Sequence, residues 1–190
     1  ACPHYNKPTQ AGLKAHFLAV AEASKKPVML YNVPSRTACN LEAATTLELA
    51  KHPNIFAVKE ASGDLAQIDT ILINRPSNFQ VFSGDDALTL AMIAAGSDGV
   101  ISVIGNALPN IFGNMVHQAL FGQILEARKA HLELSTSIDA IFEEGNPSGI
   151  KAMLEHLGIC SSLVRLPLVP ATQELKDKIY SCLAELNKID

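Results

Sequence analysis

The stretch NIFAVKEASGD, residues 54–64, joins a short apolar run to a pair of charges and then to a turn. Residues 55–58 have the apolar character of a buried strand, and the Gly and Asp at 63–64 suit a turn followed by a helix cap. Lys59 and Glu60 stand at the end of this strand. Because buried parallel strands are ordinarily apolar, two charges at this position need a reason of their own.

Short apolar runs alternate with segments of helical periodicity over the first half of the chain. The runs that predict strands are residues 28–32, 55–59, 79–83 and 99–103. The helices predicted around and between them cover residues 12–24, 41–51, 65–73 and 87–95, with N-caps at Thr9, Asn40, Asp64 and Asp85. Repetition of strand, helix and strand predicts a parallel sheet, because parallel neighbours need a crossover connection.

From about residue 107 the pattern is helical, with helices predicted over 107–121, 122–143, 147–157 and 172–188. Two architectures fit the whole pattern: an open doubly wound sheet, and the later part of an eight-stranded barrel. The first would usually bring a glycine-rich phosphate loop after its first strand, and neither GxGxxG nor GxxxxGK[ST] occurs. We therefore predict an α/β fold, the C-terminal part (about strands 4–8) of a (β/α)8 TIM barrel over 1–121, followed by a helical region over 122–190.

Composition excludes several classes of protein. The net charge is -4 and the basic residues are scattered, which argues against a nucleic-acid partner or an anionic membrane surface. The four cysteines lie far apart and show no metal-ligand spacing with histidine, so we expect reduced thiols in a cytoplasmic protein and no bound metal. Residues 99–125 carry no Asp, Glu, Lys or Arg, but polar residues interrupt them too often for a membrane span.

Polar side chains follow every predicted strand, including a truncated first one expected to end near Pro3, and in a barrel they would meet at one mouth. They are His4 to Asn6, Tyr31 and Asn32, Lys59 and Glu60, Ser83 to Asp86, and Ser102. A lysine in such a place predicts Schiff-base chemistry. An amine attacks a carbonyl only when it is unprotonated, and desolvation at the end of an apolar strand lowers its pKa from about 10.4. A phenol such as Tyr31 could then move the protons that imine formation requires.

Each of these residues also has a structural interpretation. Lys59 could be a solvated strand end and Glu60 its ionic partner or that of another lysine. Tyr31 could be a core ring, and Arg36 a surface cation. The aspartates at 85–86 are interpreted as helix caps. The combination of residues, more than any one of them, favours a catalytic site.

Four motifs in order along the chain resemble those of the dihydrodipicolinate synthase family of pyruvate-dependent, Schiff-base-forming lyases and aldolases. They are YNVPSRT (31–37), KEASGD (59–64), SGDD (83–86) and GVISV (99–103). The resemblance runs from PHYNKPTQ (3–10) to RLPLVP (165–170). It implies a lyase of lysine and diaminopimelate biosynthesis that needs no cofactor beyond a covalent lysine–pyruvate imine.

The resemblance also implies roles for three catalytic residues. Lys59 would form the imine with pyruvate, and Tyr31 would relay protons above it. Tyr5 would reach across a tight dimer interface into the proton relay of a neighbouring subunit. Family members are homotetramers built from such dimers, so the resemblance predicts a homo-oligomer with small-molecule substrates as its only other partners.

Three further residues are expected to bind substrates. Arg36 would hold the carboxylate of the second substrate, aspartate semialdehyde, a task that suits a guanidinium fork. Gly84 and Ile101 would line the pyruvate pocket. Sister enzymes, namely N-acetylneuraminate lyase and 2-keto-3-deoxy sugar-acid aldolases, keep the tyrosine and the lysine but lack this Ser-Arg, so Arg36 favours the synthase.

Two departures from the family pattern bear on activity. His4 replaces a tyrosine that contacts the feedback inhibitor lysine in some members, so the sequence leaves open whether lysine inhibits this protein. The chain is also shorter than its family, and we expect that about the first third is absent, with part of the relay and of the pyruvate site. A third hypothesis is therefore a non-catalytic, truncated subunit that only assembles with other chains.

Overall fold

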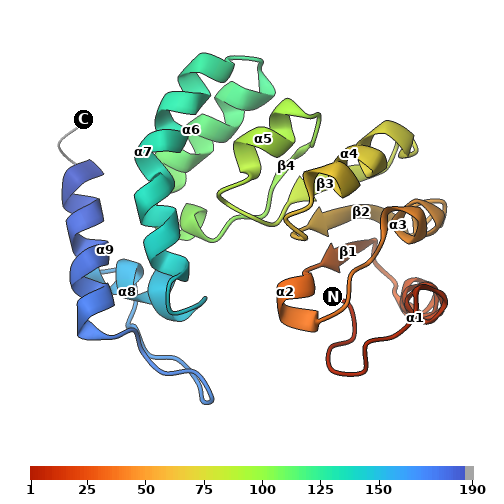
Figure 1. Cartoon of the computed structure of the whole chain (residues 1–190), viewed down its shortest axis with the longest axis horizontal. Helices are drawn as coiled ribbons and strands as arrows, with labels where there is room; N and C mark the ends of the chain where they lie inside the picture. The colour runs from red at the N-terminus through yellow and green to blue at the C-terminus, as the bar shows by residue number, and fades with distance from the viewer. Residues whose placement is uncertain (187–190) are drawn as a thin grey trace. The chain divides into compact units, whose positions relative to one another are not determined.

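The structure is a computed structural model that describes residues 1–186 (Figure 1). The chain divides into two compact units, Ala1–Ile101 and Ser102–Asp190. The division predicted after residue 121 followed the barrel pattern, in which every strand has its own helix, and it stays a prediction. Residues 187–190, the end of the predicted region 122–190 and of its last helix, lie outside the described residues.

The first unit contains a four-stranded parallel sheet in the order β1-β2-β3-β4. Its strands are β1 (Val28–Asn32), β2 (Ile55–Glu60), β3 (Gln80–Ser83) and β4 (Gly99–Val100). Tyr31 of β1 is level with Lys59 of β2, and Asn32 is level with Glu60. Since neighbouring strand residues point to opposite faces, this register places Tyr31 and Lys59 on one face and Asn32 and Glu60 on the other.

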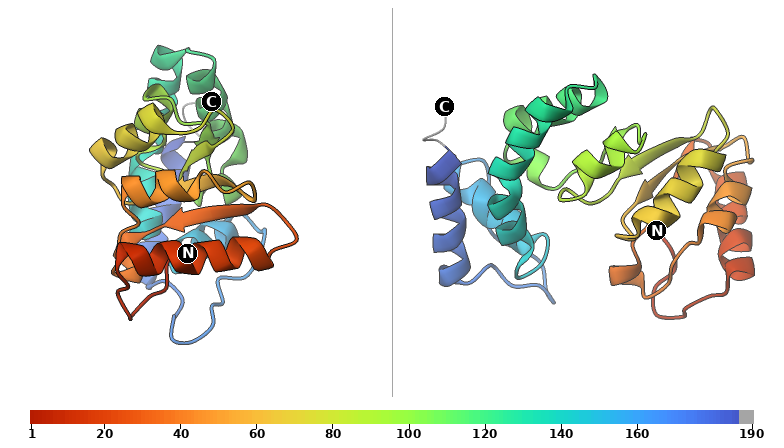
Figure 2. Two further views of the ribbon diagram at one scale, coloured as in Figure 1. Left: turned by 90° about the vertical axis from the view of Figure 1, so that its right-hand side faces the viewer. Right: turned by 45° about the horizontal axis from the view of Figure 1, so that its top comes forward.

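Helices cover the face of the sheet that carries Glu60. They are α1 (Gln10–Ala23), α3 (Ala43–Leu49), α4 (Leu65–Asn74) and α5 (Thr89–Ala94). Figure 2 (left) shows α1, α3 and α4 side by side, and α1 contacts α3 as α3 contacts α4. A doubly wound sheet would place helices on both faces, whereas successive crossovers on one face are typical of a barrel segment.

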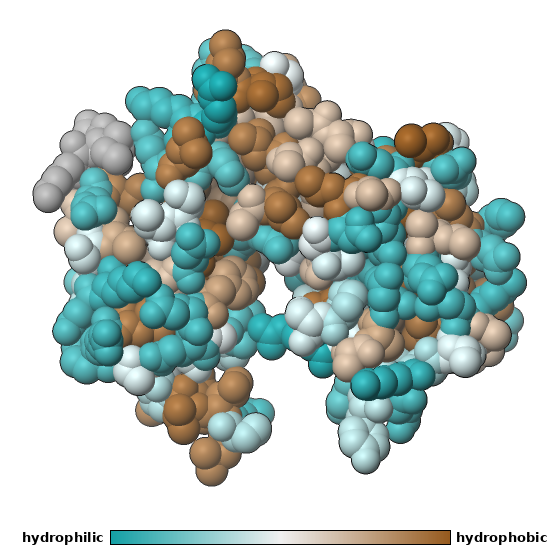
Figure 3. Space-filling view, viewed as in Figure 1, coloured by the Kyte–Doolittle hydropathy of each residue, from teal (hydrophilic) through white to brown (hydrophobic). Residues whose placement is uncertain are grey.

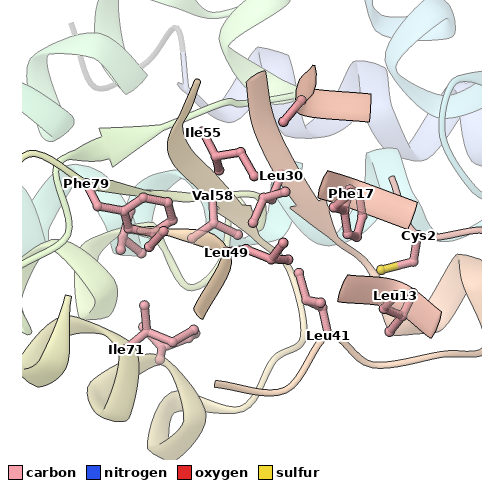
Figure 4. Packing of buried hydrophobic residues seen from close by; sticks show 14 of the residues in the cluster. Cys2, Leu13, Phe17, Leu30, Leu41, Leu49, Ile55, Val58, Ile71 and Phe79 are labelled. Carbon is pink, nitrogen blue, oxygen red and sulfur yellow. The ribbon is translucent and has the colours of Figure 1, made fainter. Parts of the chain in front are cut away.

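The core of this unit lies between the sheet and these helices. Leu30, Val58 and Val81 point to the helices and are fully buried. Figure 4 shows Leu30 and Val58 among side chains from α1, α3 and α4. Fully burying an aliphatic side chain of this size contributes about 1.5–3 kcal/mol, so the helix-covered face holds the strands in register.

Several boundaries differ from the sequence prediction for identifiable reasons. The strand predicted over 99–103 ends at Val100, because β3 ends at Ser83 and offers only one more hydrogen bond, from Ile101 N to the Ser83 carbonyl at 2.8 Å. Thr9 and Asp64 are N-caps as predicted, accepting hydrogen bonds from Gly12 N and Gln67 N.

Asn40 and Asp85 are not N-caps in the sense predicted. The N-cap of α3 is Glu42, and the Asn40 side chain instead bonds to Asn32 and Gln67. The N-cap of α5 is Leu88, and the Asp85 carboxylate accepts backbone hydrogen bonds within the preceding turn. The partners of Asn40 are distant in the sequence, whereas those of Asp85 are the amides two and three residues further on, so the difference at Asp85 lies only in where the helix begins.

The second unit is helical. After the 3₁₀ turn η1 (Ile104–Asn106) come α6 (Pro109–Leu120), α7 (Ile124–Phe142), α8 (Ser148–His156) and α9 (Gln173–Leu186). Contacts of α6, α8 and α9 with α7 hold this unit together. The loop between α8 and α9 exposes several large apolar side chains, visible as the brown projection at the lower left of Figure 3. No helix within the described residues is long and apolar enough to cross a membrane.

Gly149 marks the tightest approach between two helices of this unit. A Cβ atom on this glycine would lie 2.1 Å from the Ile141 carbonyl oxygen of α7 and 2.7 Å from Ile141 Cα. Both obstacles are backbone atoms, which cannot rotate away as a side chain could. Gly149 therefore allows α8 to lie directly against the end of α7.

We expect Gly149→Ala to lower the free energy of unfolding by about 3 kcal/mol, because the two helices must move apart. Gly113→Ala is the matched control, since a Cβ there meets nothing within 4 Å and lies inside α6. That change should be neutral or stabilising by about 0.5–1 kcal/mol through helix propensity. Denaturant unfolding followed by circular dichroism compares the two variants; equal stabilities would contradict the close approach.

Candidate active site around Lys59

Lys59 and Tyr31 lie side by side at the carboxyl ends of β1 and β2. Their strands pair in register at these residues, and the Lys59 Nζ atom lies 4.4 Å from the centroid of the Tyr31 ring. Both side chains are half-buried on the face of the sheet opposite the helices. The structure thus brings together the two residues that the sequence predicted as nucleophile and proton relay.

The surroundings of Lys59 favour a neutral amine. Burial lowers the pKa of Lys59 below its ordinary value of 10.5, and the positive charge of Arg36 acts in the same direction. The carboxylate of Asp86 opposes them and raises the pKa. The ammonium–ring contact with Tyr31 also favours the charged form, by about 1 kcal/mol for a partly desolvated pair. Desolvation is the largest influence, so the amine is more available for attack than that of a surface lysine.

Tyr31 is held in its protonated form. Burial raises the pKa of the Tyr31 phenol above its ordinary value of 10.0, and Arg36 opposes this rise. A phenol that stays protonated at neutral pH can donate a hydrogen bond or a proton to an oxygen that leaves a reacting carbon. Lys59 contacts the face of the ring, so the relay role of the Tyr31 hydroxyl stays a prediction.

Gly84 leaves room for the Lys59 side chain. A Cβ on Gly84 would lie 2.9 Å from Lys59 Cε and 3.0 Å from Lys59 Cγ, and also 2.9 Å from Ala61 Cβ. The Gly84 amide donates a hydrogen bond to the Glu60 carbonyl at 2.8 Å, which holds the chain after β3 close to the end of β2. The predicted pocket residue Gly84 is therefore in van der Waals range of the lysine because it lacks a side chain.

The remaining predicted residues occupy the same unit in different settings. Arg36 lies on α2 (Pro34–Thr37), a single turn where a loop was predicted, and its charge acts on both Lys59 and Tyr31. Ile101 directly follows β4 and is partly exposed. Tyr5 is 88% exposed and has a positive φ of 70°, an uncommon conformation for a bulky residue. The structure does not bury Tyr5 beside Lys59.

The sequence interpretation missed the part played by Asp86. This residue was assigned with Asp85 as a helix cap, but its side chain is only 2% exposed and its charge acts on Lys59. The SGDD pattern at a strand end could have suggested it, since two adjacent acidic residues cannot both cap one helix. A buried carboxylate near the amine limits how far the Lys59 pKa can fall.

One interpretation of the sequence made Glu60 the ionic partner of a lysine. In the structure Glu60 is 0% exposed and instead accepts hydrogen bonds from Asn32, Ser62 and Gln67. Among the described residues, no group of three or more His, Cys, Asp or Glu side chains is placed to hold a metal ion.

The profile of the Dihydrodipicolinate synthetase family matches residues 1–186. The chain belongs to this family. It is 48% identical over 187 residues to the 4-hydroxy-tetrahydrodipicolinate synthase of Phocaeicola vulgatus, covering 98% of this chain and 63% of that protein. The family membership inferred from the four motifs is therefore confirmed, and the chain spans about 63% of the length of this curated relative.

Solved structures of the family have the same fold. A monomeric dihydrodipicolinate synthase variant superposes with a TM-score of 0.95 at 35% identity, over 97% of this chain and 63% of its own. The Acinetobacter baumannii dihydrodipicolinate synthase, solved in complex with pyruvate, superposes with a TM-score of 0.94 at 33% identity, over 97% of this chain and 64% of its own. The prediction of a partial barrel followed by C-terminal helices is confirmed.

We expect Gly84→Ala to displace the Lys59 side chain and to lower its reactivity by about tenfold, because the added methyl group overlaps Cγ and Cε. The rate of Lys59 acetylation by acetic anhydride, read by peptide mass spectrometry against the other lysines, measures this. Gly63→Ala is the contrasting change in the same unit: it meets no atom within 4 Å but is strained by a φ of 77°. A variant Gly84→Ala that keeps full Lys59 reactivity would contradict the steric account.

Proposed function

We propose that this chain carries the lysine-imine site of a synthase that condenses pyruvate with aspartate semialdehyde. The observation that supports this most directly is the half-buried Lys59 beside Tyr31, whose amine has a lowered pKa. The match to curated synthases and the pyruvate complex of the Acinetobacter baumannii relative support the choice of substrate. Membership of lysine and diaminopimelate biosynthesis is part of the same proposal.

The first half of the reaction needs one nucleophile and one proton donor. The neutral amine of Lys59 attacks the ketone carbon of pyruvate, and the carbinolamine that forms loses its oxygen as water to give the imine. Tyr31 is the protonated group that can donate to the departing oxygen. Loss of a proton from the pyruvate methyl group then gives an enamine, in which the iminium nitrogen holds the electron pair.

The second half joins the two substrates. The enamine carbon attacks the aldehyde carbon of the semialdehyde, the aldehyde oxygen takes up a proton, and the iminium nitrogen is regenerated. Arg36 is the group suited to hold the carboxylate of the semialdehyde, because its planar fork donates two parallel hydrogen bonds. The amino group that the semialdehyde brings then attacks the iminium carbon, closes a ring and gives its proton to the departing Lys59 nitrogen, which restores the free amine.

The chemistry itself requires no separate cofactor, since Lys59 supplies the electron sink once it is joined to pyruvate. We propose a cytoplasmic enzyme that acts as a homo-oligomer. The exposed Tyr5, with its positive φ, supports a role for this residue at a subunit contact. A monomeric relative with the same fold shows that oligomerisation is not a general requirement of this fold.

Incubation with pyruvate and borohydride should leave a reduced adduct on Lys59, detected by intact mass and peptide mapping. The neutral fraction of the Lys59 amine rises as pH increases. Because its pKa lies below 10.5, trapping should reach half its maximum below pH 10.5. The other lysines are internal controls. An adduct spread evenly over all lysines, or none in a folded sample, would support the non-catalytic alternative.

Arg36→Lys should separate the synthase from the sugar-acid aldolases of the same family. The variant keeps the positive charge that lowers the Lys59 pKa but loses the guanidinium fork. We expect unchanged pyruvate trapping and a KM for aspartate semialdehyde raised by about tenfold or more. Retro-aldol cleavage of a 2-keto-3-deoxy sugar acid, with no condensation of the semialdehyde, would instead favour the sister enzymes.

A further inference from the structure

A second cluster of polar side chains lies directly behind Lys59 and Tyr31, on the helix-covered face of the sheet. Its centre is formed by Asn32 and Glu60, the residues that follow Tyr31 and Lys59 and are likewise level with each other. Both are 0% exposed. The Asn32 Nδ2 atom donates to Glu60 Oε1 at 3.0 Å and to Oε2 at 3.2 Å. One amide therefore joins the ends of β1 and β2 through their side chains.

The cluster extends to the segments that flank the two strands. The Ser62 amide donates to Glu60 Oε1 at 2.8 Å, and the Gln67 side chain of α4 donates to Oε2 at 3.4 Å. On the other side, Asn32 Oδ1 accepts a hydrogen bond from the Leu41 amide at 2.9 Å. Two strands, the segment before α3 and the first turns of α4 are thus linked through the hydrogen-bonded side chains of Asn32 and Glu60.

These hydrogen-bond partners of the Glu60 carboxylate are neutral donors. Burial raises the pKa of Glu60, and the hydrogen bonds from Asn32, Ser62 and Gln67 oppose this rise. The charges that shift the pKa of Lys59 are those of Asp86 and Arg36. The Glu60 carboxylate is not among these charges, so any influence that it has on Lys59 has to pass through the backbone.

We propose that Glu60 is a positioning residue which, together with Asn32, fixes the ends of β1 and β2 so that Lys59 and Tyr31 meet on the opposite face. The expected effect on imine formation rests on the proposed function. The placement of Lys59 by Glu60 and Asn32 does not depend on it. Adjacent residues of a strand share one backbone, so a rotation or slip of the strand at Glu60 also displaces Lys59.

A polar pair suits this task better than an apolar one. Two buried aliphatic side chains would stabilise the contact about as well, but they would tolerate small sliding movements. The Asn32 amide nitrogen lies in hydrogen-bond range of both Glu60 oxygens, of Asn40 Oδ1 and of the Leu41 carbonyl, so a displacement of one strand would disturb several of these contacts at once. Burying such a group is costly unless all its hydrogen bonds are made, which makes a shifted register unfavourable.

The test is a double-mutant cycle on the pair. Glu60→Gln places an amide nitrogen against the Asn32 amide, and Asn32→Asp places a carboxylate against the Glu60 carboxylate. The double variant restores a donor facing an acceptor with the roles exchanged. The amide nitrogen introduced at position 60 can donate to one oxygen of the carboxylate introduced at position 32, and the second oxygen of that carboxylate can keep the hydrogen bond from the Leu41 amide. The hydrogen bonds that the Asn32 amide donates to Asn40 Oδ1 and to the Leu41 carbonyl are lost in both variants that carry Asn32→Asp.

Asp98→Asn is the matched control for this cycle. It also removes a charge that accepts a backbone hydrogen bond, from Val81 N, and with it the ion pair of Asp98 with Arg75, but it does so near the amino ends of β3 and β4. A general loss of strand stability would therefore follow from the control as well as from the test variants, whereas a change in the placement of Lys59 would follow from the test variants alone.

Two readouts distinguish positioning from mere stability. Acetylation of Lys59 by acetic anhydride as a function of pH reports the environment of its amine without any substrate, and borohydride trapping with pyruvate reports imine formation. We expect each single variant to lower the trapping rate by about tenfold and to move the acetylation midpoint toward pH 10.5, the ordinary pKa of lysine. The double variant should recover to within about threefold of the parent chain, and Asp98→Asn should change neither readout.

The outcomes separate this inference from the proposed function. If the parent chain forms no pyruvate imine but the acetylation midpoint still shifts in the single variants and recovers in the double, the imine proposal fails and the positioning role stands. Folded single variants with the parent's acetylation profile would overturn the positioning role. Should the single variants not fold, Gln67→Met leaves the Asn32–Glu60 hydrogen bonds in place and removes those of Gln67 to Glu60, Asn40 and Leu41. It must still slow acetylation by about twofold, or the inference is wrong.

Discussion

The pairing of β1 with β2 is the constraint on which the rest of the site depends. A parallel register that sets Tyr31 level with Lys59 also sets Asn32 level with Glu60. The two-residue period of a strand then sends one pair to the open face and the other to the helices. The residues of the proposed chemistry, Tyr31 and Lys59, are thus the immediate neighbours of the hydrogen-bonded Asn32 and Glu60 on the same two strands. A movement of either pair displaces the other.

Opposing influences act on the protonation of Lys59 on the open face of the sheet. Desolvation and Arg36 favour a neutral Lys59, while Asp86 and the Tyr31 ring favour the ammonium. A lysine with a strongly depressed pKa would be a better nucleophile, but the iminium of the proposed reaction would be cationic and would need the same stabilisation that the ammonium receives. A nearby carboxylate that weakens the free amine as a nucleophile would therefore also stabilise the proposed intermediate.

Sequence patterns predicted those features that depend on local spacing. The four strands, the caps at Thr9 and Asp64, and the placement of Lys59 at a strand end follow from periodicity and turn residues within a few positions. The hydrogen-bonded cluster around Asn32 and Glu60 was not predicted, because these two residues are 28 residues apart and meet only when the strands pair. For the same reason Asn40 looked like a helix cap, although its amide bonds to Gln67 of another helix.

The position of Lys59 is determined from two sides by residues of opposite character. On the open face, Gly84 leaves room for the Lys59 side chain because it has no side chain of its own, and its amide donates a hydrogen bond to the Glu60 carbonyl. On the covered face, the Glu60 side chain contributes a full set of hydrogen bonds. The Glu60 carbonyl thus accepts a hydrogen bond from Gly84, which directly follows β3, while the Glu60 side chain accepts one from Asn32 of β1. Residues from β1, β2 and the end of β3 are therefore joined beside Lys59. A flexible four-carbon side chain reaches a reproducible position only when its backbone and its surroundings are both fixed, and here each is fixed by a different strand.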